Sequence, residues 1–261
     1  MKLNLILLSL SLASLAAAEL PAREIIEQHI DRHTLPDETT VMEIKLIDRK
    51  GAENTQHLRR LRKTEAGGLI RSLVVYDAPA DIKGIALLTR ENEGQSNDQW
   101  LYFPSRRRLQ RIAQGRRSGY FMGTDFTYED MDPEKPDQFS YAHLPEERIG
   151  DHLCYVIEAR PADKQAARAS GYGKRELWIR KDILFCIQVK FYDRQERLIK
   201  TRTHSDLVNL EGEVWRANRS FVDNLDKSHQ TEVRITERDV RTEIPDDTFR
   251  ERHITTGRYM K

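Results

Sequence analysis

The feature that most constrains the fold is a period-two alternation of apolar and polar residues, which recurs along most of the chain. In the clearest run, every second residue from Ile183 to Phe191 is apolar, so these side chains share one face of a strand. Comparable strand-like runs occupy residues 42–46, 69–76, 85–90, 99–103, 109–113, 153–160, 175–181, 198–204, 213–222 and 230–236. The alternation predicts a fold built mainly from β-strands.

The connections between these runs predict how the strands pair. Several are as short as Lys181-Asp182 and Glu211-Gly212, and short links join antiparallel neighbours because a parallel pair needs a crossover of a dozen or more residues. Helices are few: residues 21–33 form an amphipathic helix, and shorter pieces are expected near residues 162–169 and 246–252. We therefore predict a mainly β (α+β) chain with one large, curved antiparallel sheet, whose concave face only these helices could cover.

The N-terminus has the pattern of a secretory signal peptide. Lys2 precedes an apolar stretch that runs to Leu15, and Ala16-Ala17-Ala18 supplies the small residues read by signal peptidase. The apolar stretch is too short for a membrane-spanning helix, and a buried N-terminal helix is the alternative reading. We expect cleavage after Ala18, a single mature domain over residues 19–261, and export to a bacterial periplasm. No cysteine follows the cleavage point, so the mature chain is not expected to be a lipid-anchored lipoprotein.

The charge balance argues against binding to nucleic acid. The chain has 43 Lys and Arg residues and 42 Asp and Glu residues, and cleavage removes one basic residue, Lys2. The mature chain is then neutral overall, whereas nucleic-acid-binding proteins carry a basic surplus.

The two cysteines, Cys154 and Cys186, lie in strand-like runs with one further strand expected between them. In a simple meander, next-nearest strands lie about 9.5 Å apart, beyond the roughly 7 Å between Cα atoms that a disulfide spans. Buried free cysteines are favoured over a disulfide.

The central segment separates its charges into two blocks. Six arginines and no acid lie between Ser105 and Gly119, and six acids with one lysine lie between Thr124 and Asp137. The favoured interpretation is that the blocks pair with each other across neighbouring strands. The alternative is that the arginines contact an anionic partner or a lipid head group, with Arg106, Arg107, Arg108 and Arg111 as candidates. A calcium site is a weaker alternative, because the spacing of Asp125, Glu129, Asp130 and Asp132 is not that of an EF-hand.

Other chemical motifs give little support for an enzyme. His29 and His33 have the i, i+4 spacing of some zinc ligands, but a polar helix flank is the favoured reading. No nucleophile elbow, phosphate loop or dinucleotide fingerprint is present. A hydrolase using His152 or His204 is a third hypothesis without support from spacing. We predict no catalytic residue, no metal site and no cofactor.

Several stretches resemble a known family. The sequence "WLYFPSRRRLQRI" followed by "FMGTDFTYEDM", the later "DHLCYVIEARP" and "YGKRELWIRKDILFCIQVKFYDRQERLIKT", and the closing "EIPDDTF" are similar to the outer-membrane lipoprotein-sorting proteins, the LolA-like family. The resemblance covers about residues 90–250. It implies a half-open barrel of antiparallel strands with helices as a lid over a hydrophobic cavity. No ligand-contact residue can be matched to a motif position and carried over.

The resemblance implies a non-enzymatic periplasmic carrier that binds the acyl chains of a lipoprotein or lipid and moves this cargo toward the outer membrane. Its expected partners are the acylated cargo, an inner-membrane transporter or exporter and an outer-membrane acceptor, with the carrier itself a monomer. The alternative is a periplasmic sensory or regulatory lipid-binding module associated with a membrane protein. Candidate cavity residues are the aromatic side chains Trp100, Tyr102, Phe103, Phe121, Phe126, Trp178, Phe185 and Phe191. For any single one of them an ordinary core position is favoured, whereas some cavity lining is expected of the group.

Overall fold

A computed structural model of the chain describes residues 20–260, so the predicted signal peptide, residues 1–18, lies outside the described residues. All strands join one antiparallel sheet of 13 strands in the order β6-β5-β4-β3-β2-β1-β13-β12-β11-β10-β9-β8-β7. The strands are β1 (Asp37–Ile47), β2 (Glu53–Thr64), β3 (Ile70–Ala78), β4 (Ala86–Arg90), β5 (Asp98–Phe103), β6 (Arg108–Arg111), β7 (Phe139–Ile149), β8 (His152–Pro161), β9 (Lys174–Arg180), β10 (Cys186–Tyr192), β11 (Leu198–Glu211), β12 (Val214–Asn224) and β13 (His229–Asp239). The α-helices are α1 (Ala22–Arg32), α2 (Lys164–Ala169) and α3 (Glu251–Thr255).

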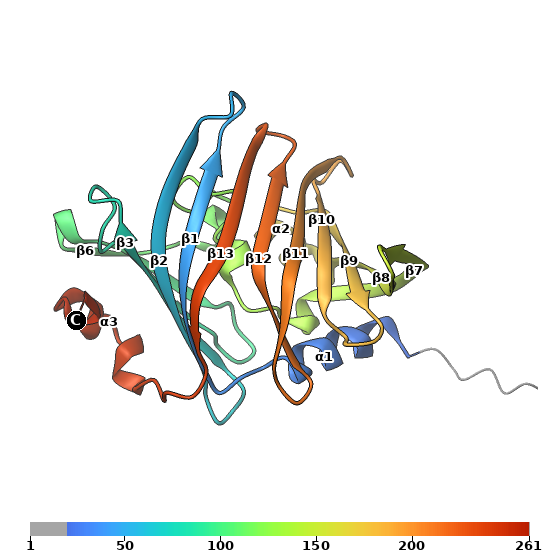
Figure 1. Cartoon of the computed structure of the whole chain (residues 1–261), viewed down its shortest axis with the longest axis horizontal. Helices are drawn as coiled ribbons and strands as arrows, with labels where there is room; N and C mark the ends of the chain where they lie inside the picture. Colours follow the sequence, from blue (N-terminus) through green and yellow to red (C-terminus); the bar gives the residue numbers. More distant parts are fainter. Residues whose placement is uncertain (1–19, 261) are drawn as a thin grey trace, which may run out of the picture.

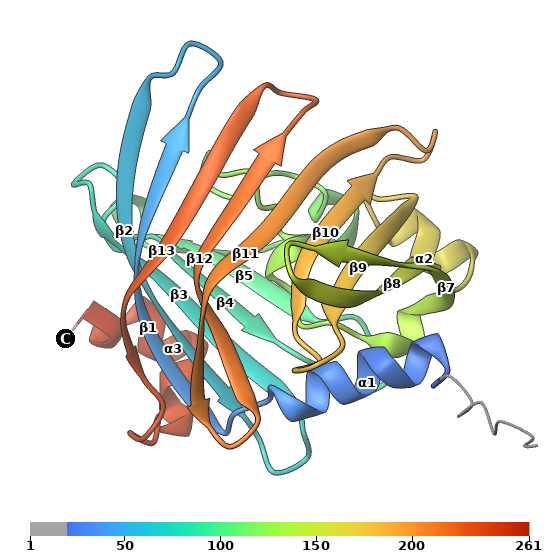
Figure 2. The ribbon, with the colours of Figure 1, turned by 45° about the vertical axis from the view of Figure 1, so that its right-hand side comes forward.

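The sheet is curved but not closed (Figures 1 and 2). Its edges are β6 and β7, which are joined by residues 112–138, here called the cover segment. Figure 2 shows the sheet bending around this segment. This confirms the predicted fold class. The chain is mainly β, and one large curved antiparallel sheet forms a half-open barrel with few helices. No helix within residues 20–260 is long and apolar enough to span a membrane.

The inner face of the sheet, which bends around the cover segment, is covered from two sides. Ile25 and Ile26 of α1 are buried against Ile157, Ile179 and Phe191 of the β8–β10 half. The cover segment packs Phe121 and other apolar side chains on the β1–β4 half. The predicted helix at residues 21–33 is therefore a cover of the inner face, as expected. The larger cover comes from the mostly non-helical cover segment, which the sequence did not predict in this role.

The C-terminal segment packs on the outer face of the sheet. The prediction that its helical piece near residues 246–252 helps to cover the concave face was therefore wrong. Phe249, Ile254 and Tyr259 are buried against β3, β4 and β5, and the Tyr259 hydroxyl donates to the Gly84 carbonyl at 2.7 Å. The reason lies in β3, where Leu73, Val74, Val75 and Tyr76 are all buried. A strand that is apolar on both faces needs a cover on each of them.

Two strands and one register differ from the sequence prediction. Neither β2 nor β7 was predicted, because β2 is rich in basic residues and β7 is a largely exposed edge. In β10, a bulge between Cys186 and Gln188 breaks the alternation. Ile187 therefore packs with Cys154, Val156 and Trp178 in a second cluster on the outer face. The prediction that Ile187 shares a face with Val189 and Phe191 was wrong.

The cysteines are free and buried, as predicted. Strand β9 lies between β8 and β10. Cys154 belongs to the outer-face cluster and Cys186 to the inner-face cluster, so the two thiols also lie on opposite sides of the sheet.

Candidate functional site

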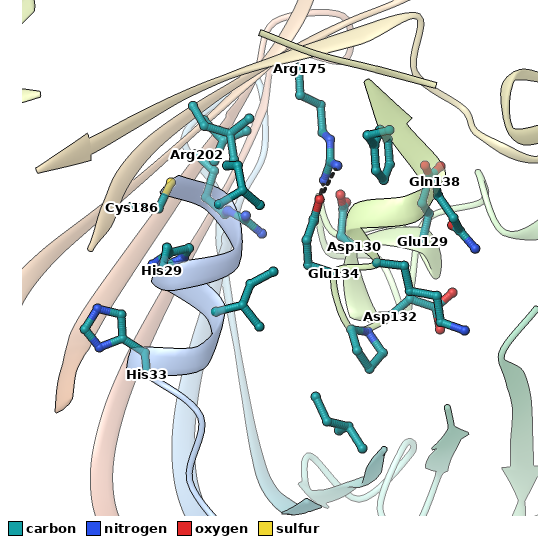
Figure 3. A pocket seen from close by; sticks show the side chains of 18 of the residues that line it. His29, His33, Glu129, Asp130, Asp132, Glu134, Gln138, Arg175, Cys186 and Arg202 are labelled. Carbon is teal, nitrogen blue, oxygen red and sulfur yellow. Dashed lines mark hydrogen bonds and ion pairs between the residues drawn. The ribbon is translucent and has the colours of Figure 1, made fainter. Parts of the chain in front are cut away.

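A cavity lies between the inner face, α1 and the cover segment (Figure 3). It has two adjoining lobes of about 370 Å³ and 420 Å³, which share lining residues that include Phe185, Arg202 and His204. Pockets of this size hold small organic ligands in many proteins. Helix α1 lines only the smaller lobe, whereas the larger lobe lies over β1–β3 and β11–β13.

The larger lobe has a continuous apolar wall. Met42 and Ile44 of β1, Val74 of β3 and Val233 of β13 present their side chains to it, and Phe121, Phe126 and Met131 of the cover segment close the opposite side. Alternation in the strands brings these side chains onto one face. Such a wall favours an acyl chain or another elongated apolar group.

The cover segment is anchored to the sheet by buried charges. Lys200 of β11 and Asp130 have side chains only 2% and 3% exposed, and their Nζ and Oδ2 atoms lie 2.6 Å apart. The Tyr172 hydroxyl lies 2.6 Å from the same Nζ and 3.0 Å from both Asp130 oxygens. Burial by itself would raise the pKa of Asp130, but the Lys200 ammonium, the Arg202 guanidinium and the Thr127 amide together more than offset this, and the pKa lies below its ordinary value.

A second anchor is Asp125, which is 1% exposed. Its carboxylate accepts hydrogen bonds from Thr231 Oγ1 at 2.7 Å and Asn224 Nδ2 at 2.9 Å, and it pairs with His229 Nδ1 at 2.7 Å. Together the two anchors fix the middle of the cover segment to β11, β12 and β13.

The arginine and acidic blocks of the central segment pair with each other mainly through Arg117 and Asp132, at 2.9 Å. The other acids have more distant partners: Glu134 binds Arg175 in two hydrogen bonds of 2.7 and 3.0 Å (Figure 3), and Glu129 accepts from Ser170 and Gly171. Pairing across neighbouring strands was therefore too local a prediction. The four acids of the calcium alternative have separate partners, which are His229 for Asp125, Ser170 for Glu129, Lys200 for Asp130 and Arg117 for Asp132. Within residues 20–260, no three His, Cys, Asp or Glu side chains gather as metal ligands.

One end of the larger lobe is basic. Arg60 and Arg62 of β2, Arg216 of β12 and Arg238 of β13 line it, and we call these four residues the basic end. A single buried carboxylate, Glu38, lies among them and accepts from Arg216 Nε at 3.1 Å and Arg238 Nε at 3.1 Å. Sequence reasoning missed the basic end. The available signal was the alternation of Leu58, Arg60 and Arg62, which places all three on one face once β2 is recognised as a strand.

The histidines of the cavity are held as neutral rings. His29 Nδ1 and His33 Nε2 lie 2.8 and 3.2 Å from the Leu184 carbonyl oxygen, to which a ring N–H donates. His33 Nδ1 accepts from the Trp215 amide at 3.1 Å. Burial lowers the pKa of His33 to about 4. The two rings join the C-terminal end of α1 to the loop before β10 and to β12. They face the cavity, so the predicted polar helix flank was wrong.

His204 lies 2.7 Å from the Ser220 hydroxyl through Nδ1. Burial lowers its pKa to about 3, far from the value near 7 that suits a general base. His152 lies at the start of β8 with an exposed side chain.

The predicted aromatic residues divide between the two faces. Phe121, Phe126, Phe185 and Phe191 line the cavity, and Phe103 packs beside the apolar cluster on the β1–β4 half of the inner face. Trp100 and Tyr102 pack against the C-terminal segment on the outer face, and Trp178 lies in the other outer-face cluster, donating from Nε1 to Glu147 at 2.9 Å.

The exposed arginines proposed for head-group binding do not reach the cavity. Arg106, Arg107, Arg108 and Arg111 are all exposed at the β6 edge, and Arg111 pairs with Asp98.

The comparisons with known proteins agree with this geometry. A family model described as "Uncharacterized protein" matches residues 68–256. A solved structure of a putative outer membrane lipoprotein-sorting protein domain from Vibrio parahaemolyticus is 28% identical over 90% of this chain and 98% of that one, with a TM-score of 0.84. The chain belongs to the LolA-like family.

Two further solved structures share the fold of this LolA-like protein. A DUF1329 family protein from Desulfovibrio piger is 23% identical, with a TM-score of 0.83 and coverage of 89% of this chain and 97% of that one. A LolA superfamily protein from Nitrosomonas europaea is 21% identical, with a TM-score of 0.70 and coverage of 90% and 100%. No curated protein matches the sequence. The family resemblance predicted from the sequence motifs is confirmed.

Proposed function

We propose that this LolA-like protein is a non-enzymatic periplasmic carrier, a single domain over residues 19–261 after cleavage at Ala18. It binds the acyl chain of a lipoprotein or lipid in the cavity and moves this cargo between a membrane transporter and an outer-membrane acceptor. The observation that carries the proposal is the apolar wall of the larger lobe, formed by Met42, Ile44, Val74 and Val233 under the cover segment.

Binding of this kind needs no covalent step. Each methylene group transferred from water to an apolar wall contributes about 0.8 kcal/mol, so a chain of moderate length is held by burial alone. The protein of Vibrio parahaemolyticus with the same fold is described as a putative outer membrane lipoprotein-sorting protein domain, which supports an acylated cargo here.

Native mass spectrometry of the protein purified from periplasm tests the proposal. We expect a bound lipid or acylated peptide, or uptake of a synthetic lipidated peptide by the empty protein. A protein that is always empty and takes up neither a lipidated peptide nor a phospholipid contradicts carriage.

A matched pair of variants places the binding site. Ser72 lines the larger lobe, so Ser72→Trp fills the cavity and should abolish uptake. Ser205 is exposed and follows His204 on β11, so its side chain lies on the outer face, and Ser205→Trp should leave uptake unchanged. Equal uptake by both variants would place the ligand outside this cavity. Affinity capture of a signalling membrane protein in place of a transporter would favour the sensory alternative.

A further inference from the structure

We propose that the basic end of the cavity binds the anionic head group, a phosphate or a carboxylate, of an amphiphile whose chain lies along the apolar wall. The proposal rests on the proposed function and narrows its cargo to anionic amphiphiles.

Strand register places the basic and apolar parts of the lobe side by side. Across β2, β1 and β13, one row contains Arg60, Thr40 and Arg238, and the next contains Leu58, Met42 and Ile235. Rows on one face are about 7 Å apart, because they are separated by two residues of extended strand. The same three strands therefore pass from a basic row to an apolar row within one cavity, which matches the polarity of an amphiphile.

The basic end has more positive charge than its own carboxylate balances. Glu38, 2% exposed, bonds with Arg216 and Arg238. Within residues 20–260, Arg60 and Arg62 have no acidic side chain at ion-pair distance, and Glu38 acts on both only at longer range. Burial lowers the pKa of Arg62 to about 10, and the nearby Arg60 guanidinium adds to the effect. Both side chains are half-buried, and a positive charge taken out of water without a close anion is costly unless a partner neutralises it.

Polar atoms without a partner gather at the same place. Arg60 Nε, Arg216 Nη2 and Thr40 Oγ1 are buried and make no hydrogen bond to the described chain. Buried donors are satisfied in the large majority of cases, so three of them in neighbouring positions indicate a ligand with several acceptor oxygens. Guanidinium groups suit carboxylate and phosphate because their N–H donors match the spacing of the oxygens.

A purely structural role explains these residues less well. Arg60 and Arg62 lie on the inner face of a central strand, where apolar side chains would pack without the cost of desolvating a charge. Arginines kept there at a cost in stability are typical of a binding site. Replacing Arg62 should therefore leave the ligand-free protein at least as stable as before.

Binding of matched amphiphiles to the mature protein tests the proposal. Dodecyl phosphate, dodecanoate and dodecanol share one chain and differ in head group, and inorganic phosphate supplies the anion alone. Isothermal titration calorimetry should show that both anionic compounds bind at least tenfold more tightly than dodecanol. Inorganic phosphate should bind far more weakly than dodecyl phosphate.

Two substitutions separate the head-group site from the rest of the protein. Arg62→Gln should weaken dodecyl phosphate binding about tenfold or more, because a hydrogen bond to a charged group contributes in this range. The same substitution should not change dodecanol binding or lower the melting temperature. Arg108→Gln, on the exposed β6 edge, is the control and should change neither affinity.

Equal affinities for dodecyl phosphate and dodecanol would overturn the head-group site while leaving carriage intact. Inorganic phosphate binding as tightly as dodecyl phosphate would overturn the amphiphile and indicate a site for a free oxyanion. A large fall in melting temperature for Arg62→Gln would show a structural role. Failure of all the dodecyl compounds to bind would contradict the proposed function itself.

Discussion

Replacement of Lys200 by methionine should release the main anchor between the cover segment and the sheet. The Lys200 ammonium lies 2.6 Å from Asp130 and 3.1 Å from the Asp125 carbonyl oxygen, and its nitrogen is 4.5 Å from the centre of the Phe191 ring. Methionine fills a similar volume but removes the charge, so Asp130 stays buried without its cation.

The magnitude follows from what remains around Asp130. Removing one partner of a buried ion pair costs about 3–5 kcal/mol. The Asp130 carboxylate keeps the Thr127 amide at 2.7 Å and the Tyr172 hydroxyl at 3.0 Å, so we expect the lower end, about 3 kcal/mol. For a domain of this size, about 2–4 °C per kcal/mol corresponds to a fall in melting temperature of about 6–12 °C.

Urea denaturation followed by circular dichroism measures the loss in unfolding free energy. The double variant Lys200→Met/Asp130→Asn should lose less than the two single variants together, because the second substitution removes the uncompensated charge. Lys164→Met, at an exposed position at the start of α2, is the control and should change stability by less than about 0.5 kcal/mol. A loss below 1 kcal/mol for Lys200→Met would refute the anchoring role of this ion pair.

Three further outcomes follow from the structure. Burial lowers the pKa of His33 to about 4 from its ordinary 6.5, so the folded state favours the neutral ring. The unfolding free energy should therefore fall by up to about 3 kcal/mol as the pH drops from 6.5 to 4. Denaturation of His33→Gln across this range should show a flatter pH dependence, and an equally steep one would exclude His33 as the cause. Glu38→Gln leaves the basic end without its carboxylate and should lower the unfolding free energy by about 3 kcal/mol or more. Adding Arg62→Gln should restore part of this loss. A wild-type melting temperature for Glu38→Gln would contradict the charge balance described above. Cys154 and Cys186 are both buried and lie on opposite faces of the sheet. They should therefore react with a thiol reagent only after unfolding. An intramolecular disulfide formed by oxidation of the native protein would be inconsistent with this sheet.

The sequence predicted the strands whose buried side chains are apolar. Alternation identified β1 and β13 because one face of each meets a cover while the other is more exposed. It failed for β2, whose inner-face positions include Arg60 and Arg62. A strand that contributes charge to a cavity loses the pattern by which strands are recognised.

The face that each aromatic residue occupies could not be read from β5 alone. Leu101 and Phe103 lie toward the inner face, whereas Trp100 and Tyr102 lie toward the outer face. Both sets are apolar because the C-terminal segment covers the outer side of this strand. Only the covers, which are non-local in the sequence, decide which set meets the cavity.

A crystal structure of the mature protein with bound dodecyl phosphate would test the central claim most directly. We predict that the alkyl chain lies along Met42, Ile44 and Val74 beneath the cover segment, with the phosphate oxygens at hydrogen-bonding distance from Arg60 and Arg62. A ligand bound outside the larger lobe, or a lobe filled by side chains with no space for the chain, would contradict it.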